Sequence, residues 1–182
     1  HTVLVLTSGH AVNETLNRNR GYDLLRDLRP VAGFAATPYW LVTTAGKASS
    51  LRDLLGRARR EPLTFASGGP GGLAHLLGEM LKQETKLDLI HVPYRGNAPA
   101  INDLVAGRVD MLFDNSGGVL EQIRARRLAA LATTSTHRLA QTPEVPTMQE
   151  LGFTGFDVSA WLGLAVPAAT DGAIVRRLHE EV

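Results

Sequence analysis

The sequence contains no cysteine. Disulfide bonds, thiol catalysis and zinc sites built on cysteine ligands are therefore excluded for these 182 residues. Long apolar stretches are also missing, since no run approaches the roughly 20 residues that a membrane-spanning helix needs. No signal-peptide pattern opens the chain, which begins at once with a predicted strand at Val3–Leu6, so we expect a processed or truncated chain.

Neither sign of charge dominates. The chain carries 19 Lys and Arg against 18 Asp and Glu, a formal net charge of +1. This balance gives no global field that would attract nucleic acid or an anionic membrane. Basic clusters at Arg57–Arg60 and Arg124–Arg127 lie on predicted helices and are better explained as solvated helix faces. With 44% apolar residues, the chain can build the core of one domain or of two small ones.

The most informative segment that is present is a glycine-rich loop between a predicted strand and a predicted helix. The loop holds Ser67, Gly68, Gly69, Gly71 and Gly72. The helix that follows places Leu73, Leu76, Leu77, Met80 and Leu81 on one side. Glycines let a ligand approach the backbone closely, and the free N–H groups at a helix N-terminus attract an anion. We therefore interpret the loop as an anion site, to which Ser67 adds a hydroxyl. The alternative is that the glycines only make a tight turn.

Strands and helices alternate along the chain. Strands are expected over 3–6, 31–36, 39–44, 64–67, 89–93, 109–113, 129–133 and 160–166. Helices are expected over 11–16, 50–59, 73–83, 99–106, 119–126, 144–151 and 173–181. Repeated strand–helix–strand units predict an α/β fold with mostly parallel sheets and helices on both faces.

In such sheets, ligands bind beyond the carboxyl ends of the strands. Three loops leave predicted strand ends, and we expect their polar residues to converge there. These candidates are Ser67, the four glycines, Tyr94, Arg95, Asp114 and Asn115. Asp114 follows a buried strand directly, and either touches the ligand or fixes its own loop.

The ordered motifs along nearly the whole chain resemble one known family. They are Thr7–Asn13, Phe65–Gly72, His75–Glu79, His91–Ala100, Gly107–Asn115, Leu128–Ser135, Pro143–Thr147 and Trp161–Ala168. Together they resemble the substrate-binding proteins of tripartite tricarboxylate transporters, the Bug family. The resemblance implies a two-lobed periplasmic binding protein with a type II fold, which passes a small carboxylate to membrane transporter subunits.

The resemblance also implies the ligand site and the lobes. It adds Thr7, Ser8, Gly9 and His10 as a cleft loop of the first lobe, and Gly96 beside Tyr94 and Arg95. The first lobe would be partial, comprising 1–44 and 158–182, and the second would be 45–157. The truncation at both ends leads us to expect self-association through the incomplete lobe. The ligand would be a dicarboxylate, tricarboxylate, acidic amino acid or aromatic acid.

Other functions fit the residues less well. Gly69, Gly71 and Ala74 match a dinucleotide-binding loop, so a dinucleotide-binding oxidoreductase remains the alternative. That site needs an acidic residue at the end of the next strand, which is predicted over 89–93. The nearest acidic residue is Asp88, which lies before this strand. No hydrolase elbow or metal-ligand spacing occurs. We therefore expect no catalytic residue, no metal and no cofactor.

Overall fold

The computed structural model describes residues 2–182, and the chain divides into two compact units. The smaller unit takes in the chain up to Thr37 and again from Ala160, and the larger unit is Pro38–Ser159. Residues 38–44 therefore belong to the larger unit, whereas the sequence placed them in the first lobe. Within this segment, Trp40–Thr44 forms the strand β3, which pairs with two strands of the larger sheet.

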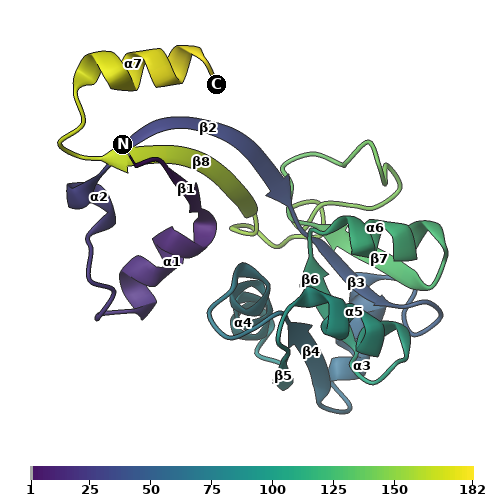
Figure 1. The fold of residues 1–182 in the computed structure, drawn as a ribbon. Helices are drawn as coiled ribbons and strands as arrows, with labels where there is room; N and C mark the ends of the chain where they lie inside the picture. Colours follow the sequence, from purple (N-terminus) through teal and green to yellow (C-terminus); the bar gives the residue numbers. More distant parts are fainter. Residues whose placement is uncertain (1) are drawn as a thin grey trace. The chain divides into compact units, whose positions relative to one another are not determined.

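The smaller unit contains one three-stranded sheet. Its elements are β1 (Leu4–Thr7), α1 (Ser8–Leu16), α2 (Leu24–Asp27), β2 (Leu28–Pro38), β8 (Ser159–Pro167) and α7 (Gly172–Glu180). The strand order is β1-β8-β2, and β1 pairs antiparallel with β8 (Figure 1). Asp171 caps α7, because its side chain accepts a hydrogen bond from the Ala173 N–H.

The larger unit is a five-stranded sheet with helices. Its elements are β3 (Trp40–Thr44), α3 (Leu51–Ala58), β4 (Leu63–Ser67), α4 (Leu73–Thr85), β5 (Leu89–Pro93), α5 (Asn97–Val105), β6 (Met111–Asp114), α6 (Gly117–Arg124) and β7 (Leu128–Thr133). The order is β5-β4-β6-β3-β7. The α/β class is confirmed, and the sheet is mixed: β4 pairs parallel with β5 and β6, whereas β3 pairs antiparallel with β6 and β7. The helix expected over 144–151 is wrong, because those residues form turns and one isolated bridge.

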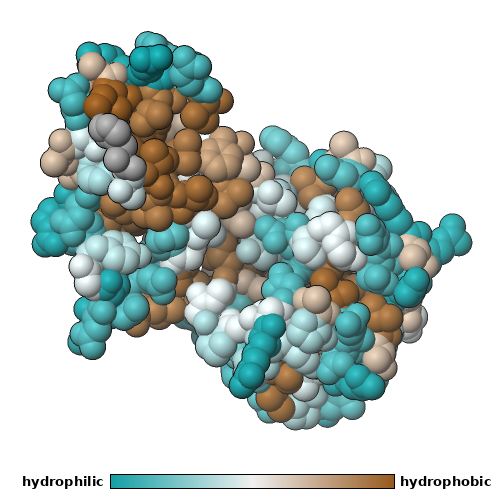
Figure 2. Space-filling view, in the orientation of Figure 1, coloured by the Kyte–Doolittle hydropathy of each residue, from teal (hydrophilic) through white to brown (hydrophobic). Residues whose placement is uncertain are grey.

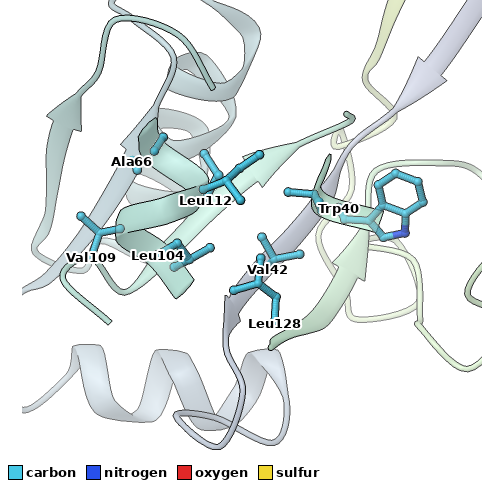
Figure 3. Close-up of a cluster of buried hydrophobic side chains, with 10 residues drawn as sticks. Trp40, Val42, Ala66, Leu104, Val109, Leu112 and Leu128 are labelled. Carbon is cyan, nitrogen blue, oxygen red and sulfur yellow. The ribbon is translucent and has the colours of Figure 1, made fainter. Parts of the chain in front are cut away.

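Both faces of the larger sheet are covered by apolar packing. One buried cluster is formed by Trp40, Val42, Ala66, Ala100, Ile101, Leu104, Val109, Leu112, Val119 and Leu128 (Figure 3). It joins α5 and α6 to the strands, and burying a side chain such as Leu112 stabilises the fold by about 1.5–3 kcal/mol. Neighbours along a strand point to opposite faces, so Phe65 beside Ala66 points away from this cluster. There its ring lies against Gly78 of α4.

The larger unit has a repeated local plan that positions the loops of interest. Each of the parallel strands β4, β5 and β6 is followed by a short loop and then by a helix. Their carboxyl ends therefore meet at one edge of the sheet, together with the N-termini of α4, α5 and α6. No helix within residues 2–182 has the length and apolar character needed to cross a membrane.

Candidate functional site

The glycine-rich loop after β4 borders a hollow of about 310 Å³ in the larger unit. The hollow is lined by Tyr39, Gly68, Gly69, Pro70, Gly72, Leu73, Ala74 and Asn97. All of these lining residues are uncharged, so an anion that enters the hollow meets no carboxylate among them. The loop and the start of α4 supply most of the wall.

The first turn of α4 supplies backbone donors at this wall. The N–H of Leu76 donates to the carbonyl oxygen of Gly72 over 3.0 Å and opens the helical ladder. Within residues 2–182, the N–H groups of Leu73 and Ala74 form no backbone hydrogen bond with a group outside α4. Both residues line the hollow, and the positive end of the helix dipole adds to their attraction for an anion.

Three N–H groups of the loop are already used within the protein, and one of them is that of Gly72, which donates to the Gly69 carbonyl oxygen over 3.4 Å. The N–H of Gly69 donates to Ser67 Oγ over 3.2 Å, and the N–H of Gly71 donates to His75 Nδ1 over 3.1 Å. Gly71 has φ +78, a conformation that favours glycine, and it does not line the hollow. The free donors of this site therefore come from the start of the helix, not from Gly71.

Beneath the loop lies a stack of three rings. The His75 and His91 rings have centroids 4.0 Å apart, and the Phe65 ring stacks on His91 at 5.0 Å. His91 Nε2 lies 2.7 Å from Ser67 Oγ, which also donates to the Gly69 carbonyl oxygen over 3.0 Å. Burial and the neighbouring His75 lower the pKa of His91. Ser67 therefore supports the loop from below and does not line the hollow.

Asn97 joins the loops after β5 and β6. Its side-chain amide donates to Asp114 Oδ2 over 2.5 Å, and the Ser116 N–H donates to Asp114 Oδ1 over 2.6 Å. Asp114 is fully buried, and burial raises the pKa of its carboxyl despite these hydrogen bonds. Burial and the charge of Asp114 raise the pKa of Tyr39 to about 12. Asp114 thus fixes its loop, which is one of the two roles expected from the sequence.

The loop after β5 does not line the hollow at Tyr94, Arg95 or Gly96. The Tyr94 ring packs on the buried cluster and its hydroxyl donates to Asp103 Oδ2 over 2.8 Å. Arg95 is exposed, and Asn115 is half-buried; neither lines the hollow. Gly96, with φ +106, supports the site indirectly because its N–H donates to the Gly68 carbonyl oxygen over 2.9 Å.

The remaining candidates lie in the smaller unit. Thr7 ends β1, and Ser8, Gly9 and His10 form the first turn of α1, where the sequence suggested a loop. The N–H of Thr7 donates to His10 Nδ1 over 3.1 Å, so His10 closes the start of its own helix.

Sequence reasoning missed part of the hollow. It did not select Tyr39, Pro70, Leu73, Ala74 or Asn97. Asn97 had a usable signal, because it opens a helix two residues after Arg95 at the edge where ligands bind. Leu73 and Ala74 contribute backbone groups, which side-chain chemistry does not reveal.

One core residue and one alternative function can also be placed on the structure. Trp40 is a core residue, since its indole N–H donates to Thr142 Oγ1 over 2.9 Å inside the larger unit. The dinucleotide-binding alternative gains no support, because β5 ends at Pro93 and is followed by Tyr94 and Arg95 where an acidic residue is needed. Within the part of the chain that the structure describes, no group of three or more His, Asp or Glu could hold a metal ion.

Comparisons with known proteins agree on one family. The sequence profile described as "Tripartite tricarboxylate transporter family receptor" matches residues 1–182. The chain is 40% identical over 186 residues to the "UPF0065 protein in tcbD-tcbE intergenic region" of Pseudomonas sp. (strain P51), covering 100% of this chain and 55% of that protein.

Two solved structures show the same fold. An R. palustris protein with adipate superposes with a TM-score of 0.85 at 32% identity, over 97% of this chain and 60% of that one. MatC from Rhodopseudomonas palustris with bound malate superposes with a TM-score of 0.81 at 29% identity. The match covers 98% of this chain and 62% of that one. The chain thus spans about half the length of the curated relatives it matches.

Proposed function

The chain belongs to the tripartite tricarboxylate transporter receptor family, and from that premise we propose that its larger unit binds one carboxylate group of a small organic acid in the hollow beside α4. A receptor of this family binds its substrate and is not an enzyme. The single observation that carries the proposal is the pair of unused N–H groups of Leu73 and Ala74 at a wall without charged side chains.

The hollow suits a carboxylate in charge and in donor geometry. Two adjacent N–H groups at a helix N-terminus match the two oxygens of a carboxylate, and the helix dipole favours the negative charge. Asn97 also lines the hollow, and its side-chain amide donates one hydrogen bond to Asp114. Asp114 does not itself line the hollow, although its charge acts on Tyr39 at the wall.

The family and its relatives suggest the substrate class and the setting. Relatives have been solved with adipate and with malate, both dicarboxylates, and we propose a dicarboxylate as the ligand of this receptor. We further propose that it acts in the periplasm and delivers the acid to the membrane subunits of a tripartite tricarboxylate-type transporter.

Removing one backbone donor tests the site without adding bulk. Leu73 is the first residue of α4, and Gly72 before it has φ −72 and ψ 160, which suits a residue that precedes proline. Leu73→Pro therefore deletes one N–H group while the helix can still begin there. Leu73→Ala is the matched control, because it removes the same side chain and keeps the N–H.

Isothermal calorimetry with adipate and malate measures the effect, and adipamide serves as the uncharged control ligand. We expect Leu73→Pro to weaken binding of the dicarboxylate about tenfold or more relative to Leu73→Ala, since hydrogen bonds to charged groups contribute about 1.5–3 kcal/mol. Adipamide should not bind. Equal affinities for the two variants would exclude the start of α4 as the carboxylate site.

A further inference from the structure

The conformation of the glycine loop depends on a histidine at the start of α4. His75 is the third residue of α4, and its Nδ1 accepts the hydrogen bond from the Gly71 N–H over 3.1 Å. Nδ1 can accept only while it carries no proton, so the ring is neutral and its proton lies on Nε2. Nε2 lies 3.8 Å from Glu79 Oε1, one turn further along the helix.

The loop is held by a second histidine at its other end. His91 contacts Ser67 Oγ, and Ser67 both accepts from the Gly69 N–H and donates to the Gly69 carbonyl oxygen. The two histidine rings stack on each other, with an interplanar angle of 26°. Gly69 and Gly71, both with positive φ, are therefore each tied to one ring of this pair.

We propose that His75 is a positioning residue: it holds the glycine loop in its ligand-binding conformation through the Gly71 N–H, and protonation of His75 releases the loop. The inference rests on the proposed function, in which this loop forms the wall of the carboxylate site. It assigns a role to a residue that does not itself line the hollow.

The chemistry of the imidazole sets the direction of this effect. A proton added to Nδ1 faces the Gly71 N–H, so two donors oppose each other and the hydrogen bond is lost. The titratable groups that face the ring are Glu79 on α4, which attracts the cation, and His91 on β5, whose own protonation would repel it. The loop therefore loosens when the His75 ring gains its second proton, because the Gly71 N–H then has no acceptor there.

Asparagine provides a variant that separates position from charge. The Oδ1 atom of an asparagine can occupy the place of histidine Nδ1 and accept the same hydrogen bond, but it does not titrate. His75→Asn should therefore keep the loop in place at every pH, whereas His75→Ala removes the acceptor at every pH. His91→Gln is the matched control for the stack, since its amide can still contact Ser67.

The test follows the backbone amide resonances of Gly69 and Gly71 by nuclear magnetic resonance, without ligand, from about pH 8 to pH 5. In the unmodified chain we expect these resonances to shift together with those of the His75 ring. In His75→Asn they should stay near their pH 8 positions, and in His91→Gln the Gly71 shift should persist. In His75→Ala we expect the Gly71 amide to exchange with solvent about tenfold faster at all pH values, as one lost hydrogen bond implies.

Two outcomes would overturn the inference: glycine resonances that do not move with pH in the unmodified chain, or a His75→Asn variant that titrates in the same way. Because no ligand is added, this result is independent of whether the site binds dicarboxylates. The affinity for adipate then connects the loop conformation to the proposed carboxylate site. It should fall about tenfold more between pH 8 and pH 5 in the unmodified chain than in His75→Asn, and protonation of adipate itself is common to both.

Discussion

A Cβ atom on Gly68 would overlap the side-chain oxygen of Asn97, so the loop after β4 lies directly against the start of α5. The Gly96 N–H reinforces this contact by its hydrogen bond to the Gly68 carbonyl oxygen. Asn97 in turn donates to Asp114 at the end of β6. The three loops at the carboxyl edge of the sheet are therefore joined side by side, which gives the wall of the hollow a fixed shape.

Gly68→Ala tests this junction. The added methyl group must displace Asn97, and overpacking of this kind costs about 1–3 kcal/mol. We expect urea unfolding to show that loss, with weaker dicarboxylate binding because Asn97 moves. Gly72→Ala is the control: Gly72 has φ −72, and its nearest neighbour to a new Cβ is 3.5 Å away, so its stability should change little. Equal losses in both variants would contradict the proposed contact.

Asp114→Asn tests the cost of the buried carboxylate. Because burial raises the folded-state pKa of Asp114, the folded protein binds this proton more tightly than the unfolded chain does. The stability that protonation provides is therefore present below about pH 4 and is lost as the pH rises through the raised pKa. Asparagine does not titrate, so the variant should gain stability relative to the unmodified chain as the pH rises.

The measurement is the free energy of urea unfolding at several pH values between about 4 and 7, for both proteins. The difference between them should grow over the lower part of this range and then level off. A constant difference, or one that grows toward acid, would show that Asp114 does not have a raised pKa.

Much of the fold was predictable, because local patterns determine it. The strand at 64–67, the glycine loop and the following helix were placed nearly correctly, since glycine, apolar periodicity and capping residues act over short distances. The helix expected over 144–151 failed for the opposite reason. Thr133 forms an isolated parallel β-bridge with Thr147, and the Met148 N–H donates to the Thr133 carbonyl oxygen over 2.8 Å. These long-range bonds hold the segment in turns.

The location of the candidate site was predictable from the sequence, but the groups that form it were not. The edge of the sheet and the glycine loop follow from the order of strands and helices. That order does not reveal which N–H groups remain free, because the Gly71 N–H is bonded to His75 and the Gly69 N–H to Ser67. The packed face of α4 also differs from the expected one: Ala74, Leu77, Gly78 and Leu81 are buried. Gly78 faces the core because the Phe65 ring fills the space beside it.

The last prediction concerns the exposed apolar side chains of the smaller unit, which Figure 2 shows as a broad brown area. They include Val3, Val5, Phe34 and Leu162, which are 49%, 51%, 48% and 39% exposed. Exposed apolar patches and sheet edges favour association, so we expect the chain to self-associate through this sheet.

Phe34→Thr with Leu162→Thr should reduce that association, because threonine keeps a preference for strands while removing apolar surface. Leu25→Ser is the control, since Leu25 is 90% exposed but lies on α2, outside the sheet. Light scattering across a wide concentration range should show larger species for the unmodified chain and for Leu25→Ser, and monomer for the double variant. A chain that is monomeric throughout, or a double variant that associates equally, would contradict the prediction, because the sheet would then not be the surface that drives association.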